Sequence, residues 1–306
     1  MKRLSDITEK KYGGNTNIDL HIHSKNSDGG ETTLELLQRF KRYDIISFTD
    51  HDSVQCYYDL LTMRNDGLKD KVIIPGVELC YRYNNELRDM LGYGIDVGIV
   101  NEFLKRRYPK SERLKKQQIC LGKTKEVFRK KGLRFDEDID VVSGNKSEAF
   151  VVMYNSLMKY PENIENYDFI ANIGYFYRYY YSNRETDFFV DESFDLPSAG
   201  EVAGLIHEAG GLAFLAHPCA YSKEQTEWVK YIEDAADNRI DGIEVYHYSA
   251  DIPAVRFLYR TAKEKGLFIS GGSDFHQNGK HCGFGKTKVP YGDIKSWIES
   301  VELFSL

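Results

Sequence analysis

The chain has 306 residues, of which 42% are hydrophobic and 29% are charged, so it can bury the core of a large α/β domain and does not have the composition of a disordered protein. A formal net charge of −6 gives no broadly basic surface, which argues against binding to duplex nucleic acid. The five cysteines have no paired spacing, and the sequence has no signal peptide and no membrane-spanning run, so we expect a cytoplasmic protein with free thiols.

Short apolar runs alternate with longer amphipathic stretches in the first hundred residues. We expect strands over residues 17–23, 44–52 and 71–79, with helices over 31–43 and 53–66 between them. Strands that are separated by single helices are typical of parallel βα units. The sequence therefore predicts an α/β fold.

The same alternation returns after residue 196. The predicted helices are 198–211, 222–237 and 251–266, and the predicted strands are 211–218, 241–247 and 267–276. Thr32 with Glu35, and Ser198 with Glu201, have the spacing of capping boxes at two helix starts. Gly266 is placed to end another helix.

Residues 102–196 do not repeat this alternation. They contain a charged helical segment at 111–132 and an aromatic segment at 175–190. We expect an inserted, mainly helical subdomain that interrupts one domain formed by residues 1–101 and 197–306. Because loops that follow strands border active sites in such folds, the insertion is a candidate lid. The aromatic residues Tyr175 to Tyr181 fit either a base-stacking surface or the core of the subdomain.

Histidines and carboxylates recur at the ends of the predicted strands, where parallel α/β folds gather side chains on one face. His21 and His23 are two residues apart in a strand, so both side chains project to the same side. A single histidine of this kind is usually structural, but convergence of several favours a metal site. The set comprises His21, His23, Asp28, His51, Glu78, His217, Asp274 and His276. Mixed imidazole and carboxylate ligands suit manganese, zinc or iron.

Five motifs in this order resemble those of the PHP (polymerase and histidinol phosphatase) family. They are DLHIHS, FTDHD, GVEL, LAHP and GSDFH, within residues 18–98 and 197–281. The resemblance implies a distorted (β/α)7 barrel in which a cluster of two or three divalent metal ions hydrolyses phosphoesters. The insertion and the run DGIEVYH further resemble the branch that acts on nucleoside phosphates and short RNA ends.

Carried over by position, the resemblance makes all eight residues of the set metal ligands. In that branch a histidine usually opens the segment corresponding to DMLGYG, whereas Asp89 stands there in this chain. Aspartate is a harder ligand, which favours manganese or magnesium over zinc. The alternative is that Asp89 marks a site with fewer metal ions or none.

Other polar residues near these motifs have expected roles. Asp19 and Asp50 adjoin ligand histidines, where a carboxylate either orients an imidazole or forms an ordinary strand-end hydrogen bond. His247 is the candidate for contacting substrate or protonating the leaving group. His207, within a helix, is expected to be structural, and His281 lies in a glycine-rich loop from which it could approach the site.

Lys110 and Arg113 lie three residues apart at the start of a predicted helix and therefore share a face. Basic residues are common at this place in the resembling branch, so they are candidate phosphate contacts, although a solvated charged face is the alternative. The chain has no G-x-S-x-G elbow, P-loop or Cys-x5-Arg loop, as expected if metal ions do the chemistry.

These observations favour a phosphoesterase acting on a small phosphorylated metabolite, such as a nucleotide or nucleoside bisphosphate, or on a short oligonucleotide end. Two alternatives remain: a histidinol-phosphate phosphatase and a non-catalytic metal-binding module.

Overall fold

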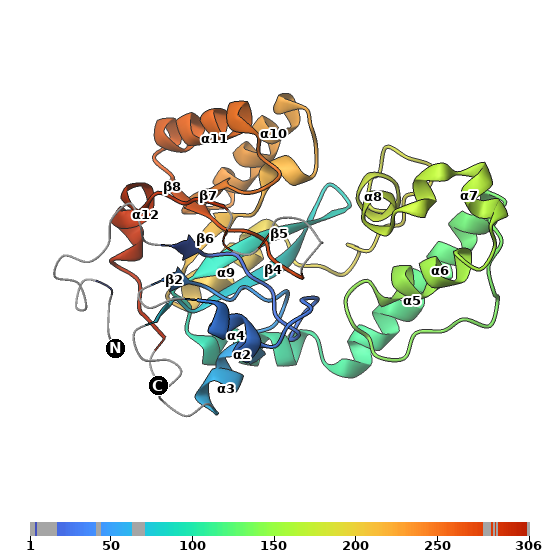
Figure 1. Ribbon diagram of the computed structural model, residues 1–306, viewed down its shortest axis with the longest axis horizontal. Coiled ribbons are helices and arrows are strands. Elements are labelled where there is room, and N and C mark those ends of the chain that lie inside the picture. Colours follow the sequence, from blue (N-terminus) through green and yellow to red (C-terminus); the bar gives the residue numbers. More distant parts are fainter. Residues whose placement is uncertain are drawn as a thin grey trace. The chain divides into compact units, whose positions relative to one another are not determined.

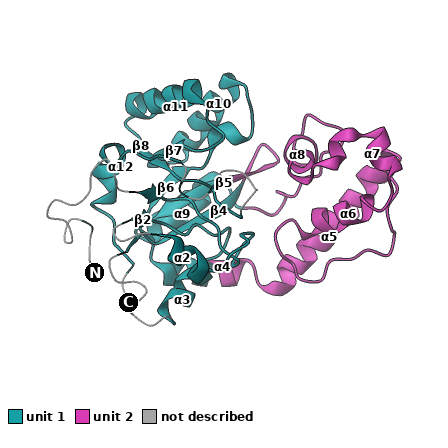
Figure 2. Cartoon of the chain, in the orientation of Figure 1, with its two compact units in different colours: residues 1–81, 89–103, 197–306 teal, residues 82–88, 104–196 magenta. Residues whose placement is uncertain are grey.

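The computed structural model describes residues 4, 17–40, 44–62, 71–277, 283, 285 and 287–304. The chain divides into two compact units (Figure 2). Unit 1 comprises residues 1–81, 89–103 and 197–306, and unit 2 comprises residues 82–88 and 104–196.

Unit 1 is built on two sheets. The strands are β1 (Ile18–Asp19), β2 (Ile45–Ile46), β3 (Val72–Ile73), β4 (Gly76–Tyr83), β5 (Glu86–Tyr93), β6 (Leu212–Leu215), β7 (Gly242–Tyr246) and β8 (Phe268–Gly271). The first sheet has the order β1-β2-β3 and is parallel, with Ile45 opposite both Ile18 and Val72. The second has the order β4-β5-β6-β7-β8, in which β6, β7 and β8 are parallel.

The strand expected over residues 71–79 is two strands, β3 and β4, which belong to different sheets. Pro75 separates them and has no amide hydrogen to donate to a ladder. The next amide, that of Gly76, donates instead to the hydroxyl of Tyr57 at 2.6 Å. The expectation of a single strand here is therefore wrong.

A hairpin interrupts the predicted parallel pattern. Asn84 and Asn85 connect β4 to β5 with φ angles of 49° and 66°, the positive values that a tight two-residue hairpin turn requires. β5 then pairs antiparallel with β6, with Met90 opposite Leu215. Glu78 and Asp89 thus lie on neighbouring strands.

Isolated bridges connect the two sheets. Ile22, beyond β1, pairs with Phe275, beyond β8, and His51, beyond β2, pairs with Glu78 on β4. The fold is mixed α/β. The described strands nevertheless form two separate sheets, so the expected seven-stranded barrel is not established.

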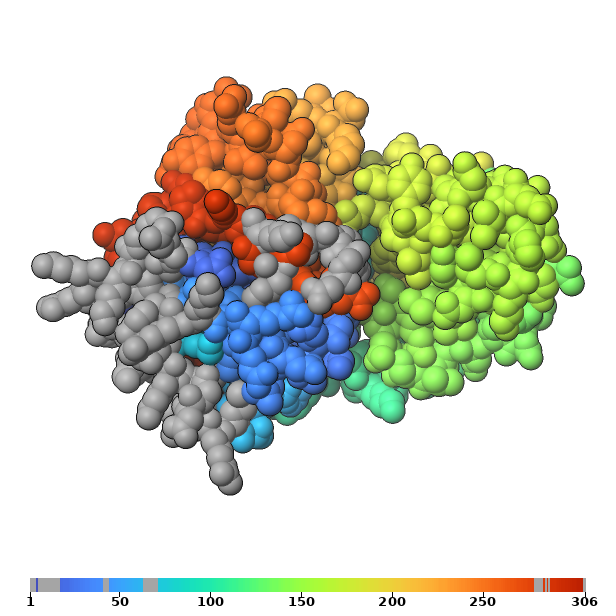
Figure 3. Space-filling view, in the orientation of Figure 1, coloured from blue at the N-terminus to red at the C-terminus, as the bar shows by residue number. Residues whose placement is uncertain are grey.

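Helices cover the sheets of unit 1 (Figure 1). They are α2 (Thr33–Arg39), α3 (Gln55–Leu61), α4 (Val97–Arg107, whose last turn belongs to unit 2), α9 (Ala199–Glu208), η4 (Pro218–Ala220), α10 (Gln225–Asp237), α11 (Ile252–Lys265) and α12 (Tyr291–Ile298). Both predicted capping boxes are confirmed, at Thr32 and Ser198, and Gly266 ends α11 with φ 69°. In Figure 3 the orange surface of unit 1 is that of α10 and α11.

The core of unit 1 contains an aromatic group between the second sheet and α12. Trp297 on α12 stacks on Tyr93 of β5 at 5.4 Å between ring centroids, and Phe214 of β6 contacts both rings. The indole nitrogen of Trp297 donates to the carbonyl oxygen of Ile269 at 2.8 Å. Burying these rings fixes α12 against the strands and gives the strand ends a rigid support.

Unit 2 is mainly helical. Its helices are α5 (Lys110–Lys130), α6 (Glu148–Leu157), α7 (Glu162–Asn166), η2 (Asp168–Ala171), α8 (Ile173–Phe176) and the π-helical η3 (Tyr177–Tyr181). Phe128, Phe150, Phe176 and Tyr181 are fully or almost fully buried in its core. None of the helices in the described part of either unit combines the length and apolar composition of a membrane span.

Candidate metal centre

The ends of the unit 1 strands position the candidate ligands. His21 and His23 follow β1, His51 follows β2, and Glu78 and Asp89 lie within β4 and β5. The remaining ligands come from the C-terminal half: His217 follows β6, and Asp274 with His276 follows β8. The structure brings all nine sequence-predicted ligands into four overlapping groups whose ligand atoms lie within 4.8 Å of one another.

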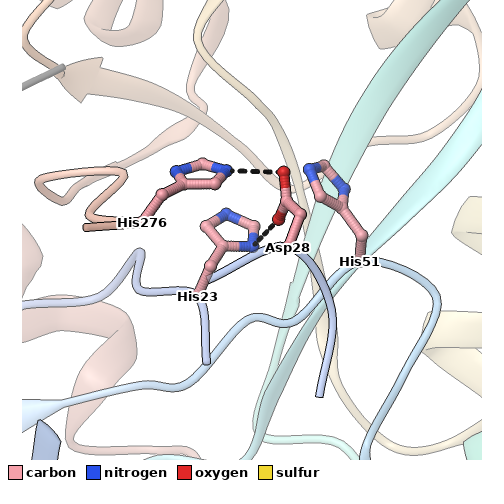
Figure 4. A group of neighbouring side chains, drawn as sticks. All are labelled: His23, Asp28, His51 and His276. Carbon is pink, nitrogen blue, oxygen red and sulfur yellow. Dashed lines mark ion pairs between the residues drawn. The ribbon is translucent and has the colours of Figure 1, made fainter. Parts of the chain in front are cut away.

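One group consists of His23, Asp28, His51 and His276, whose side chains converge in Figure 4. Nε2 of His276 lies 3.0 Å from one oxygen of Asp28, and Nδ1 of His23 lies 3.6 Å from the other. The carboxylate of Asp28 thus faces two imidazoles from opposite ends of the chain.

Glu78 lies at the middle of the cluster and is fully buried. Its Oε2 lies 3.1 Å from Nδ1 of His51, 3.2 Å from Nε2 of His23 and 3.3 Å from Nε2 of His21. Its Oε1 lies 2.9 Å from Nε2 of His217. One carboxylate therefore reaches four imidazoles and has the position of a bridging ligand.

Asp274 faces the same imidazoles from β8. Its Oδ1 lies 3.2 Å from Nε2 of His23 and 3.5 Å from Nε2 of His21. Those two ring nitrogens are only 3.1 Å apart. His21, His23 and Asp274 therefore form a second possible ligand group.

Asp89 lies at another corner of the cluster, next to His51 and Cys80. Its Oδ1 lies 3.8 Å from Nδ1 of His51 and accepts a hydrogen bond from the thiol of Cys80 at 3.2 Å. Its Oδ2 accepts from the hydroxyl of Tyr221 at 2.7 Å. Our sequence analysis missed Cys80 as a site residue. Its spacing of two residues from Glu78 on one strand was the available signal.

Opposite charges outweigh burial in setting protonation. Burial lowers the pKa of His23. The carboxylates of Asp274 and Glu78, which accept from its ring, have the larger effect and raise this pKa to about 10. Burial raises the pKa of Asp274, but the facing charges of His276 and His21 hold it well below its usual range. Protonated imidazoles thus supply the positive charge that these carboxylates need when no cation is bound.

The donor set fits divalent cations. Oε2 of Glu78 is buried, and three imidazole nitrogens lie 3.1 to 3.3 Å from it, so several nitrogen and oxygen donors face one point. The facing nitrogens of His21 and His23 cannot both donate to each other, but both can bind a cation through their lone pairs. Manganese, zinc and iron accept such mixed nitrogen and oxygen donors.

Backbone strain gathers around the cluster. Asp52, His217 and Asp274 have positive φ angles of 46°, 25° and 50°, which side-chain-bearing residues rarely adopt. Gly272 approaches His21 so closely that a Cβ there would lie 2.3 Å from the Cβ of His21. The loop after β8 therefore requires glycine at this position to bring Asp274 to the site.

A carboxylate that sequence analysis missed orients two of the histidines. Oε1 of Glu244, on β7, lies 2.9 Å from Nδ1 of His21, and its Oε2 accepts from the amide of His217 at 2.9 Å. The signal for Glu244 was its place in a strand that ends next to His247.

Asp50, unlike Glu244, accepts hydrogen bonds from Ser24, at 2.7 Å from both its amide and its hydroxyl.

Asp19 likewise accepts from Ser273, at 2.6 Å to its hydroxyl and 2.8 Å to its amide. The hydrogen bonds described for Asp19 and Asp50 therefore match the strand-end alternative rather than contacts with an imidazole.

The other predicted histidines lie in three situations. His247 is buried beside the cluster, with Nε2 3.4 Å from Asp274 and Nδ1 2.8 Å from the hydroxyl of Ser249. Burial lowers its pKa. His207 pairs with Asp241 at 2.7 Å. His281 lies outside the described residues.

The candidate substrate contacts of the insertion lie in unit 2. Lys110 and Arg113 are exposed in the first turn of α5. Within the aromatic segment, Phe176 and Tyr181 have no exposed surface and pack in the unit 2 core, whereas Tyr175 is 48% exposed. These positions match the core interpretation for Phe176 and Tyr181.

Comparison with known proteins gives relatives that cleave phosphoesters, although no family model matches the chain. The chain is 27% identical over 278 residues to a 5′-3′ exoribonuclease of Haemophilus influenzae, covering 87% of this chain and 90% of that protein. It is 25% identical over 272 residues to a 3′,5′-nucleoside bisphosphate phosphatase of Chromobacterium violaceum, covering 86% and 88%. A phosphoribosyl 1,2-cyclic phosphate 1,2-diphosphodiesterase of Eggerthella lenta is 25% identical, covering 84% and 93%.

Solved structures share the fold. An amidohydrolase from Chromobacterium violaceum with bound sulfate and no metal superposes with a TM-score of 0.65 at 22% identity, covering 95% of this chain and 99% of that one. A proposed metal-dependent phosphoesterase from Bifidobacterium adolescentis gives 0.63 at 17% identity, covering 93% and 96%. The sequence relatives thus agree with the branch that the motifs resemble, which acts on nucleoside phosphates and RNA ends, and the solved structures share the fold.

Proposed function

We propose that this chain is a metal-dependent phosphoesterase that hydrolyses a phosphate ester of a nucleotide, a nucleoside bisphosphate or a short oligonucleotide end. The observation that carries the proposal is the convergence of five imidazoles and four carboxylates, of which Glu78 is one. The relatives support it, because each is named for cleaving a phosphoester.

In this proposal the nine converging residues hold two or three divalent cations, of manganese, zinc or iron. Such cations activate water and neutralise charge on phosphoryl oxygens. Glu78 would be a ligand in this centre, because its carboxylate lies within 3.3 Å of four imidazoles that would also hold the cations.

His247 is proposed to donate a proton to the leaving oxygen or to contact the substrate. Its ring lies beside the ligands, with Nε2 3.4 Å from Asp274. The hydroxyl of Ser249 at Nδ1 limits rotation of the ring and keeps Nε2 directed toward the cluster.

Residues 102–196 are proposed to act as a lid that supplies phosphate contacts. Lys110 and Arg113 support this role because both are exposed on the first turn of α5. Lys110→Ala and Arg113→Ala are expected to raise KM while metal content stays unchanged. An unchanged KM in both variants would remove them from the site.

We further propose that the two sheets close into a distorted (β/α)7 barrel, supported by the bridges Ile22–Phe275 and His51–Glu78.

A cytoplasmic location is also proposed. Free thiols at Cys56, Cys80, Cys120 and Cys219 in the described structure support it.

The deciding experiment combines elemental analysis of the purified protein with phosphate release from adenosine 5′-monophosphate and adenosine 3′,5′-bisphosphate, with and without manganese. Bound metal together with release from either nucleotide supports the proposal. Bound metal without release from a panel that includes histidinol phosphate and short oligoribonucleotides would favour a metal-binding module. Absence of metal would contradict the assigned centre.

A further inference from the structure

A cysteine occupies a ligand position in the candidate metal centre. Cys80 lies two residues after Glu78 on β4, so both side chains project from the same face of the strand. Its sulfur lies with Nδ1 or Nε2 of His51 and a carboxylate oxygen of Asp89 in one group of atoms within 4.8 Å. Cys80 and Asp89 are buried.

Two separations among these atoms are close to those of ligands that share one cation. Ligand atoms bound to zinc at ordinary bond lengths lie about 3.4 to 3.5 Å from one another in a tetrahedron. The sulfur of Cys80 is 3.2 Å from Oδ1 of Asp89, which is 3.8 Å from Nδ1 of His51. That nitrogen is in turn 3.1 Å from Oε2 of Glu78. One sulfur, one nitrogen and one oxygen thus lie close enough together to hold one cation, and an oxygen of Glu78 lies next to the nitrogen.

Neighbouring groups orient these donors. Tyr221 donates to Oδ2 of Asp89 at 2.7 Å, which leaves Oδ1 directed toward Cys80 and His51. The backbone amide of Cys80 donates to Asp52 at 3.1 Å and fixes the strand there. Oε2 of Glu78 is buried 3.1 Å from Nδ1 of His51, so a cation bound to this nitrogen would also lie near a carboxylate oxygen.

We propose that Cys80 is a metal ligand, and that Cys80, His51 and Asp89 form a site for a thiolate-binding cation, Zn²⁺ or Fe²⁺. When the cation binds, the S–H bond of Cys80 breaks, its proton passes to solvent, and the cation takes the place of that proton between sulfur and Asp89. A soft thiolate reverses the preference for manganese or magnesium expected from Asp89 alone. The inference rests on the metal centre of the proposed function but not on its hydrolytic activity.

Cobalt substitution tests this coordination without requiring turnover. The full chain is stripped with a chelator and loaded with Co²⁺, which absorbs in the near ultraviolet by sulfur-to-metal charge transfer only when a thiolate is bound. We expect this band in the wild type and in Cys120→Ser, a control at a buried thiol of α5. We expect its loss in Cys80→Ser, a nearly isosteric change whose hydroxyl can still donate to Asp89.

Zinc content provides the second measurement. Cys80→Ser is expected to retain about one equivalent less zinc than Cys120→Ser after dialysis, because a hydroxyl is a much weaker zinc ligand than a thiolate. A wild-type protein that binds cobalt without the band would overturn the inference, as would an unchanged band in Cys80→Ser. Phosphate release without the band would support the phosphoesterase and contradict Cys80 as a ligand. The band without phosphate release would support Cys80 as a ligand and contradict the proposed activity.

Discussion

Glu244 holds the side chain of His21 through a 2.9 Å contact between Oε1 and Nδ1, across a separation of 223 residues. Burial raises the pKa of Glu244, but the charges of His21 and His247 have the larger effect and lower it below its ordinary value. The group is therefore a carboxylate and accepts a hydrogen bond from Nδ1–H of His21. Nε2 of His21 is thereby directed toward Glu78 and Asp274. The orientation of His21 is thus set from β7 as well as from its own strand.

Glu244→Gln is expected to weaken metal binding about 10- to 100-fold, the usual cost of losing a carboxylate that orients a ligand histidine. The measurement is zinc affinity in chelator-buffered solutions, with Glu126→Gln as the control because Glu126 is an exposed residue of α5 that pairs with Lys130. Equal zinc affinity in both variants would mean that Glu244 does not orient the ligands.

His23→Ala and Asp274→Ala are each expected to abolish metal-dependent phosphate release, a greater loss than the ~10–100-fold that removal of an orienting partner costs. Both residues contribute atoms to the cluster around Glu78. His207→Ala is the matched control, because His207 lies on α9 and pairs with Asp241 just before β7. Full activity in either ligand variant would contradict the assigned site.

Gly272→Ala is expected to destabilise the protein by about 1–3 kcal/mol through overpacking and to lower its metal content. The added Cβ would lie 2.3 Å from the Cβ and 2.4 Å from the amide nitrogen of His21, and that backbone cannot move aside easily. Gly204→Ala, in an exposed position of α9 with open space around it, should instead gain about 0.5–1 kcal/mol. Urea unfolding with metal analysis checks both variants, and equal stability would contradict the close approach.

Glu192→Gln is expected to reduce the pH dependence of stability. Burial raises the pKa of Glu192 above its ordinary value of 4.5, and Oε1 of this carboxyl group has no hydrogen-bond partner. The contribution of the protonated Glu192 side chain to stability is complete below pH 4.5, where this group is protonated in the folded and the unfolded state. It is lost as the pH rises through the raised folded-state pKa. The thermal unfolding temperature of the wild type should therefore fall more steeply from pH 4.5 to neutral pH than that of the variant.

The control for Glu192 is Glu185→Gln, an exposed carboxylate of the same unit. It should follow the wild-type pH profile. If Glu192→Gln and Glu185→Gln have identical profiles, the buried carboxyl group is ionised throughout and the expected effect of burial is wrong.

The sequence predicted the location of the ligands better than the path of the strands. His-x-His and Asp-x-His pairs after apolar runs require only that parallel strands end on one face, and the structure brings these residues together. The hairpin was missed, although Asn84 and Asn85 are typical turn residues. The division of one predicted strand at Pro75 and the antiparallel direction of β5 depend on which strands pair, and a single sequence does not specify that.

Glu244 and Cys80 were missed for a related reason. Each lies inside a strand, where the side chain that faces the site depends on alternation and register rather than on a motif. Glu244 becomes recognisable only when β7 is placed beside His21, and Cys80 only when β4 is placed beside Asp89.

The bridge between Ile22 and Phe275 has a consequence for the order of events during synthesis. His21 and His23 are synthesised early, but Asp274 and His276 are synthesised only after some 250 further residues have been translated. Chains fold from the N-terminus as they are made, so the first strands must wait with their ligands incomplete. Metal loading is then an event of the nearly finished chain, and a nascent chain stalled before residue 274 would lack a complete cluster.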